Sequence, residues 1–181
     1  MRLEPLREFE RRLRRVLRLG RRYFTVCLID DAAMKQMNRR FRGKARPTDV
    51  LSFPWDNAWS RFLMKRGRDP MRHFLGDIAI SVETARRNAR TEGHSLRNEI
   101  RWLILHGVLH LLGYNHETDG GAMTAREWAL REELGLNRRE VRRRPTEVRR
   151  PARSACATQA PLNPIRTFRF SLQTRRSISV K

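Results

Sequence analysis

The eleven residues WLILHGVLHLL, at 102–112, constrain the fold of this chain more than any other stretch. Nine of them are apolar or glycine, and the two exceptions are His106 and His110. A helix that is apolar on every side is normally buried on every side. The sequence therefore predicts a central buried helix, which Ser95 can cap at its start and Gly113 can end.

Amphipathic helices and short apolar strands are predicted around this central helix. Helical periodicity or helix caps mark four further segments, and branched and aromatic residues mark three strands. The helices are expected at 4–20, 31–43, 82–93 and about 121–134, and the strands at 22–30, 48–55 and 74–82. The polar segment 56–73 is expected to be a loop. We predict one domain over residues 1–140 and a separate tail over residues 141–181.

The chain is strongly basic in both parts. Forty Lys and Arg against nineteen Asp and Glu give a formal charge of +21, of which the tail supplies +10 through eleven basic residues and one acid. Such an excess is typical of proteins that bind a polyanion such as nucleic acid, although a basic composition without such a partner is the alternative. The low apolar content and scattered prolines of the tail predict disorder.

The sequence also limits the compartment. No apolar run approaches the roughly eighteen residues of a membrane span, so we expect a soluble protein with no membrane partner. Two cysteines, Cys27 in a predicted strand and Cys156 in the tail, do not form a disulfide framework. A reducing, cytoplasmic location is the expectation.

Three histidines at one end of the central helix predict a metal site. His106 and His110 are four residues apart, so a helix stacks them on one face about 6 Å apart along its axis. Gly113 can end the helix and let the chain turn back, so that His116 reaches the same point. Zinc sites with three protein ligands typically keep a fourth position for water and are catalytic. The alternative is two core histidines bonded to carbonyl groups, with His116 on the surface by chance.

The histidine spacing also matches the zinc motif of metzincin proteases, but one residue excludes their usual chemistry. Gly107 stands where those proteases carry a Glu as general base. A glycine within a helix costs roughly 1 kcal/mol relative to alanine, which indicates that a neighbour needs the space. A protease is therefore disfavoured.

Hydrolysis of a phosphodiester agrees with both the metal site and the charge. Zinc lowers the pKa of a bound water to about 7, and the positive charge favours a polyanionic substrate. Arg42, Lys44 and Arg46 in RGKARPTDVLSFP are candidates to stabilise phosphate charge, the alternative being a solvated basic loop.

Two acidic residues are further candidates. Glu99 lies on the helical face of His106 and His110, where it either hydrogen-bonds a ligating histidine or is an exposed acid in the first turn. Asp77 interrupts an apolar strand, which predicts a buried carboxylate with its hydrogen bonds satisfied.

Three segments in order, RGKARPTDVLSFP, LGDIAISVETARRNA and HGVLHLLGYNH, resemble the signature blocks of the YbeY family of rRNA maturation factors. The resemblance covers roughly residues 5–137. It implies an α+β fold with a mixed sheet of about four strands and a metal site at one end of a groove. It also implies that His106, His110 and His116 bind one zinc ion and that Arg42 is catalytic.

The function implied by the resemblance is that of a zinc-dependent, single-strand-specific endoribonuclease. It would mature the 3′ end of 16S rRNA and act in ribosome quality control, with RNA and the small ribosomal subunit as partners. A ribosome-assembly factor with structural zinc and little catalysis is the alternative. The chain departs from the family in three ways: Asn115 replaces the usual Asp, no strand precedes the first helix, and the basic tail is long.

Overall fold

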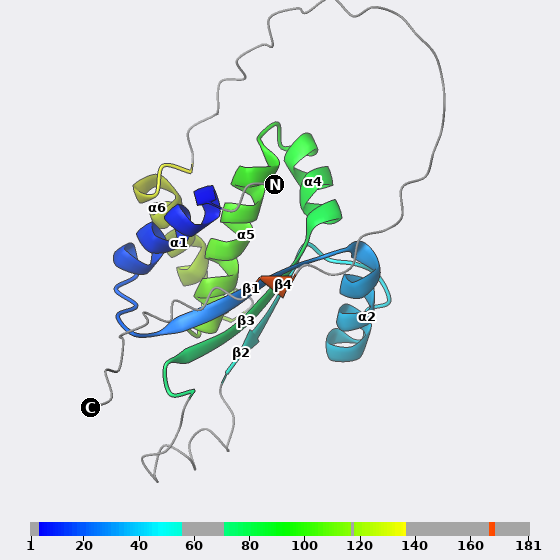
Figure 1. Cartoon of the computed structure of the whole chain (residues 1–181), viewed down its shortest axis with the longest axis horizontal. Helices are drawn as coiled ribbons and strands as arrows, with labels where there is room; N and C mark the ends of the chain where they lie inside the picture. Colours follow the sequence, from blue (N-terminus) through cyan, green and yellow to red (C-terminus); the bar gives the residue numbers. More distant parts are fainter. Residues whose placement is uncertain (1–3, 56–70, 117, 137–166, 169–181) are drawn as a thin grey trace, which may run out of the picture.

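The computed structural model describes residues 4–55, 71–116, 118–136 and 167–168. The first fifteen residues of the predicted loop at 56–73, and nearly all of the predicted tail, lie outside these ranges. Helices gather on both faces of a twisted sheet (Figure 1). None of the described helices is long and apolar enough to cross a membrane.

The sheet is mixed, as predicted. Strand β1 (Tyr23–Ile29) runs parallel to the central strand β3 (Phe74–Ser81), and β2 (Val50–Pro54) runs antiparallel to β3 on its other side. A two-residue segment, β4 (Thr167–Phe168), pairs antiparallel with β1 and gives the order β2-β3-β1-β4. The α+β class is therefore confirmed, and three of these strands have five or more residues. The described residues begin in a helix.

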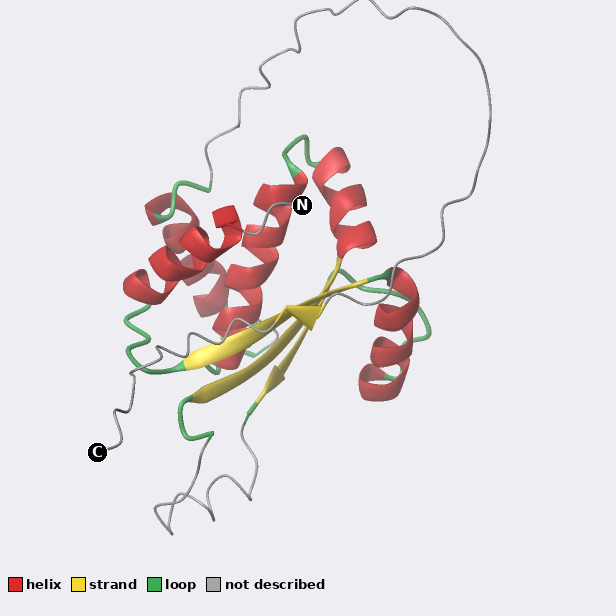
Figure 2. Ribbon diagram, in the orientation of Figure 1, coloured by secondary structure: helices red, strands yellow, loops and turns green. Residues whose placement is uncertain are grey.

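Five helices of the described residues surround the sheet (Figure 2). They are α1 (Glu4–Val16), α2 (Asp31–Arg42), α4 (Val82–Thr91), α5 (Leu96–Leu111) and α6 (Ala122–Glu133). Helices α1, α5 and α6 form the main core with one face of the sheet, and α2 covers a smaller apolar cluster on the other face. The predicted central helix is thus confirmed as the middle of the main core.

Local capping sets the ends of α2 and α5. Asp30 precedes α2 and accepts a hydrogen bond from the Ala33 N–H at 2.7 Å, while Gly43 ends the helix in the left-handed region at φ 69°. Ser95 accepts from the Asn98 N–H at 3.2 Å to begin α5. These contacts satisfy backbone groups that a helix leaves unpaired at its ends, which is why the sequence marked both starts correctly.

Gly107 lets α5 approach the sheet closely. A Cβ atom at this position would lie 2.8 Å from Cγ2 of Ile78 and 2.9 Å from its Cδ1. The contact confirms that a neighbour needs the space at Gly107. It also fixes the height of α5, and of the two histidines on either side of Gly107, above strand β3.

The prediction for Asp77 is wrong. Its side chain is exposed and not buried. Alternation along β3 places Asp77 on the same face as Ala79, which packs in the smaller cluster beneath α2. The cover provided by α2 does not extend to Asp77, so its carboxylate meets solvent and needs no buried partner.

Candidate metal centre

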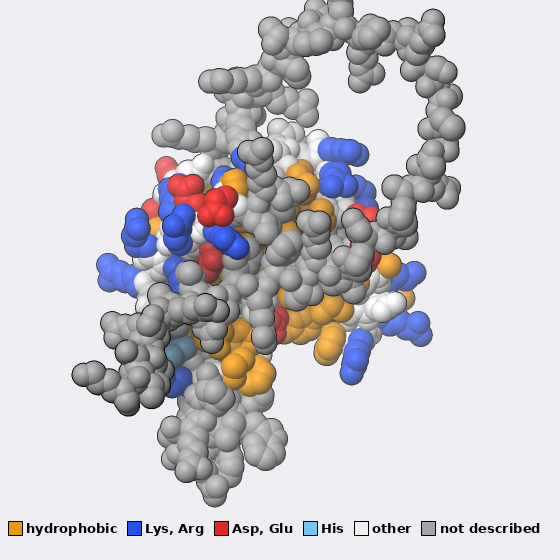
Figure 3. All heavy atoms as spheres, in the orientation of Figure 1, with side chains coloured by type: hydrophobic (Ala, Val, Ile, Leu, Met, Phe, Trp, Pro, Cys, Tyr) orange, Lys and Arg blue, Asp and Glu red, His pale blue; other side chains and the backbone are white. Residues whose placement is uncertain are grey.

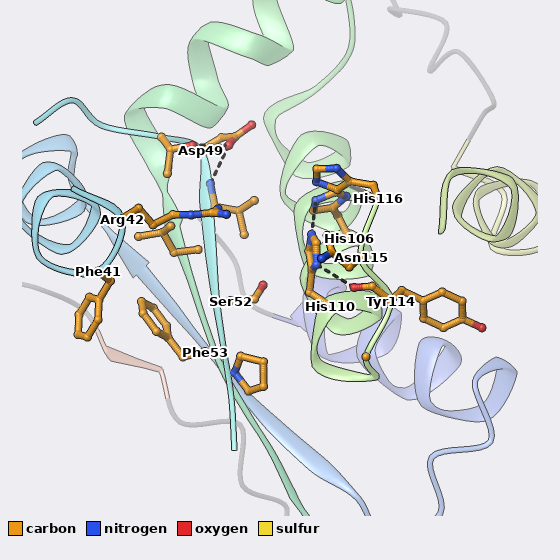
Figure 4. Close-up of a pocket in the computed structure, with 15 residues that line it drawn as sticks. Phe41, Arg42, Asp49, Ser52, Phe53, His106, His110, Tyr114, Asn115 and His116 are labelled. Atoms are coloured by element: carbon orange, nitrogen blue, oxygen red, sulfur yellow. Dashed lines mark hydrogen bonds between the residues drawn. The ribbon is translucent and has the colours of Figure 1, made fainter. Parts of the chain in front are cut away.

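The three predicted histidines converge at the C-terminal end of α5. His106 and His110 lie one turn apart on the helix, and His116 follows the turn at Gly113 (Figure 4). One nitrogen from each ring can be chosen so that all three lie within 4.8 Å of one another. The convergence that a three-histidine metal site requires is therefore present, with His116 on its exposed side.

The hydrogen bonds of His106 and His110 leave their Nε2 atoms facing each other. Nδ1 of His110 donates to the carbonyl oxygen of Tyr114 at 3.0 Å, and Nδ1 of His106 donates to Oε2 of Glu127 at 3.1 Å. A carbonyl and a carboxylate only accept, so both Nδ1 atoms carry a proton. In neutral rings the two Nε2 lone pairs then meet at 3.1 Å, an arrangement that a shared cation stabilises.

The donor set fits a small divalent metal ion. Two nitrogens that bind one tetrahedral zinc at about 2.0–2.1 Å lie about 3.3 Å apart, close to the 3.1 Å separation of Nε2 in His106 and His110. His116 supplies a third nitrogen from the exposed side. Burial of His110 lowers its pKa, and the charges of His106, His116 and Arg42 lower it further. A lowered pKa keeps the ring neutral, as a metal ligand must be.

Glu127 is a site residue that the sequence analysis missed. It lies on α6, is buried, and pairs through Oε1 with Nη2 of Arg131 at 2.5 Å while Oε2 accepts from His106. Burial acts to raise the pKa of Glu127, but the hydrogen bond to His106 and the charge of Arg131 outweigh it and lower that pKa. Glu127 thus remains an anion that holds His106 in one tautomer. A Glu on an amphipathic helix gives no sequence signal for such a role.

Both predictions for Glu99 are wrong. Its side chain is buried and not exposed, and its hydrogen-bond partner is Nε2 of His94 at 2.6 Å and not a ligating histidine. The His94 ring packs on Trp102 with 4.3 Å between ring centroids. His94 directly precedes the cap residue Ser95 and lies five residues before Glu99, so this pair forms locally at the start of α5.

A groove of about 770 Å³ opens beside the histidines. Its walls come from the end of α2, from strand β2, and from α5 with the following turn, and Arg42 extends across β2 in the direction of the histidines (Figure 4). Asp49 also lines the groove, but Oδ1 accepts from the Val50 N–H and the Thr48 hydroxyl, and Oδ2 accepts from Asn88. These contacts give Asp49 a structural role at the start of β2.

The basic residues of the RGK segment meet in a second hollow. Arg42, Lys44 and Arg46 line a space of about 220 Å³, and Arg42 also lines the main groove. The Asn38 amide donates to the carbonyl oxygen of Arg46 at 2.7 Å and holds this segment against α2. The hollow is therefore a positively charged extension of the groove that contains the histidines.

Comparisons with known proteins place this geometry in context. The family model described as endoribonuclease YbeY matches residues 6–135. A protein named endoribonuclease YbeY from Moorella thermoacetica is 44% identical over 128 residues, which cover 66% of this chain and 77% of that protein. One of the same name from Solibacter usitatus is 40% identical over 136 residues, covering 75% and 82%. The solution structure of TM1509 from Thermotoga maritima aligns with a TM-score of 0.49 and 29% identity, covering 73% of this chain and 80% of that one.

Proposed function

The chain belongs to the endoribonuclease YbeY family, and from this membership we propose that it is a zinc-dependent endoribonuclease that cuts single-stranded RNA. The observation that carries the proposal is the convergence of three histidine nitrogens at one end of a groove that also contains Arg42. The proposed cellular role is maturation of the 3′ end of 16S rRNA and ribosome quality control in the cytoplasm.

Each side chain of the site has a proposed task. His106, His110 and His116 hold one zinc ion, and Glu127 keeps His106 oriented. When bound, zinc supplies a Lewis acid that polarises phosphate and lowers the pKa of a coordinated water to about 7. The turn at Gly113 leaves His116 exposed, so that the site is open to a long polymer.

Arg42 is the proposed catalytic residue among the basic side chains. Its guanidinium can donate two parallel hydrogen bonds to a phosphate and stays charged throughout the reaction. It lines both the groove and the basic hollow, so it can stabilise negative charge that develops at the scissile phosphate. Lys44 and Arg46 are proposed to hold a neighbouring phosphate, with the small ribosomal subunit as the source of the RNA.

The proposal is tested by measuring metal content and RNA cleavage together. Purified full-length protein, a chelator-stripped sample and His110→Ala are compared on single-stranded rRNA fragments. We expect one zinc per chain in the wild type, and we expect the loss of both zinc and cleavage in the variant. Cleavage by His110→Ala at the wild-type rate would show that the active site is elsewhere.

A ribosome-assembly factor with structural zinc is the competing function. Asn115 favours it, because an amide beside the third histidine cannot accept a proton as a carboxylate can. Arg42→Ala separates the two functions. A nuclease loses rate under saturating RNA, whereas an assembly factor loses RNA affinity alone. A protease remains disfavoured, because Gly107 packs against Ile78 and leaves no room for a general base.

A further inference from the structure

Phe41 is a large aromatic side chain left exposed at the margin of the groove. It belongs to the apolar stripe of α2 with Met34 and Met37, but the stripe runs past the edge strand β2, and 56% of Phe41 is exposed. Its ring meets Phe53 of β2 edge-to-face, with centroids 5.0 Å apart and an angle of 68°. Phe53 therefore supports one edge of the Phe41 ring while more than half of the residue meets solvent.

The surroundings of Phe41 are basic and adjoin the metal centre. Phe41 and Phe53 line the same groove as the three histidines and lie on the α2 side of β2 (Figure 4). The Arg40 guanidinium carbon is 5.6 Å from the centroid of the Phe41 ring, and Arg42 follows directly in the chain. Residues 39–46 include five Lys or Arg and no acid. Further Lys and Arg side chains lie in patches on the face drawn in Figure 3.

This combination selects one class of ligand. Single-stranded nucleic acid presents a flat base on each nucleotide and a phosphate beside it, and its binding sites combine a basic groove with aromatic rings on which bases stack. An acidic or apolar peptide would match only one of the two features. In a duplex, by contrast, each base is already stacked and paired, so it cannot reach the Phe41 ring.

We propose that Phe41, supported by Phe53, is a stacking platform for one unpaired RNA base, whose phosphate lies in the hollow of Arg42, Lys44 and Arg46. The inference rests on the proposed function, because it assumes that RNA occupies the groove. It assigns the preference for single strands to a specific side chain. The platform binds substrate at a distance from the reacting phosphate, and it needs no bound metal.

The test removes the base and the ring separately and then together. Full-length zinc-loaded protein is mixed with fluorescent single-stranded oligoribonucleotides, each with one abasic ribose at a different position, and anisotropy is read within seconds, before cleavage. Base stacking on an aromatic ring is worth about 1–3 kcal/mol, so one abasic position should weaken wild-type binding by roughly fivefold or more. Phe41→Leu should cause a similar loss with the intact oligonucleotide and no further loss at that position. Phe41→Trp should restore affinity.

Trp128→Leu is the matched control. Trp128 on α6 is 57% exposed and has the Arg131 guanidinium 5.5 Å from a ring centroid, yet it does not line the groove. The Trp128→Leu variant should leave RNA affinity unchanged. Thermal unfolding of Phe41→Leu should match the wild type within a few degrees, because the leucine keeps the apolar contact with Phe53.

The outcomes separate the platform from the proposed function. If wild-type protein cleaves RNA but the abasic scan is flat, or if Phe41→Leu and abasic losses simply add, the platform is wrong and the nuclease stands. An equal loss in Trp128→Leu would also overturn the platform. If wild-type protein neither binds nor cleaves single-stranded RNA, both proposals fail.

Discussion

Two histidine–carboxylate pairs lie at opposite ends of α5, and they differ in what the histidine does with its remaining nitrogen. His94 and Glu99, at the start of the helix, meet at 2.6 Å with side chains only 9% and 7% exposed. His106 and Glu127, near the groove, meet at 3.1 Å, and the His106 side chain is 27% exposed. The Glu127 contact uses Nδ1 and leaves Nε2 directed at His110. A buried histidine–carboxylate contact is therefore not a functional site by itself.

Trp102 and Arg131 connect the two pairs. The Trp102 ring packs against His94 on one side, and the Arg131 guanidinium carbon lies 4.6 Å from a Trp102 ring centroid. Arg131 then binds Glu127. The pair near the groove therefore has an additional cation that stabilises the carboxylate, and its histidine is free to share a metal ion with two others.

The largest expected effect is on metal affinity, which should depend on Glu127 and not on Glu99. Removing a carboxylate that orients a ligating histidine typically costs 10–100-fold in metal affinity. Glu127→Ala should therefore weaken zinc binding by roughly that factor in competition with a chromogenic chelator, and Glu127→Gln, which still accepts from Nδ1, should lose less. Glu99→Ala is the control and should bind zinc like the wild type. Equal losses in Glu127→Ala and Glu99→Ala would remove the distinction between the pairs.

The pair of His94 and Glu99 is expected to contribute to folding stability and not to metal binding. His94→Ala leaves the buried carboxylate of Glu99 without its partner, which costs about 1–3 kcal/mol of unfolding free energy. Urea denaturation should show this loss while metal content stays at the wild-type level. Replacing both residues with leucine should recover part of the stability, because apolar groups then fill the space. Loss of zinc in His94→Ala would place this pair in the metal centre.

The close approach of α5 to the sheet, which positions His106 and His110, can be tested at Gly107. In Gly107→Ala the new Cβ would lie within 2.8 Å of Ile78, and overpacking typically costs about 1–3 kcal/mol. The better helix propensity of alanine offsets roughly 1 kcal/mol, so a net loss of about 1 kcal/mol is expected. Ile78→Val in the same chain should relieve part of it. A more stable Gly107→Ala variant would show that the close approach is not required.

Asp31 is a carboxylate that does not line the groove of the histidines. It accepts from the hydroxyls of Ser81 and Thr84 and pairs with Arg87 at 2.8 Å. Burial acts to raise the pKa of Asp31, but these contacts lower it to about 2. A depressed folded-state pKa contributes stability above the unfolded value, near 4, and that stability is lost as the pH falls through about 2.

The expected effect at Asp31 is the smallest, because the Arg87 side chain is 56% exposed and solvent screens the pair. Asp31→Asn should cost about 1 kcal/mol or less at pH 6. Urea midpoints of variant and wild type should converge as the pH falls from 5 to 2. A gap that stays constant over that range would mean that the charge of Asp31 does not stabilise the fold.

Local sequence features predicted the parts of the site that lie close together in the chain. His106, His110 and His116 span eleven residues, so helix geometry and one glycine turn are enough to bring them together. The starts of α2 and α5 were equally predictable, because an Asp at 30 or 31 and Ser95 can cap the nearest backbone groups, and Asp30 and Ser95 do so. The signature blocks in their order were enough to identify the family, which the family model confirms.

Tertiary packing alone decided that a carboxylate of α6 meets a histidine of the metal centre. His106 and Glu127 are 21 residues apart, and only the packing of α6 against α5 brings them together, whereas His94 and Glu99 are five residues apart and meet locally at the start of α5. Asp77 became exposed for the same kind of reason, since its environment depends on how far α2 covers the sheet. Hydrogen bonds over a few residues are set by local geometry, whereas contacts between elements depend on how the whole core packs.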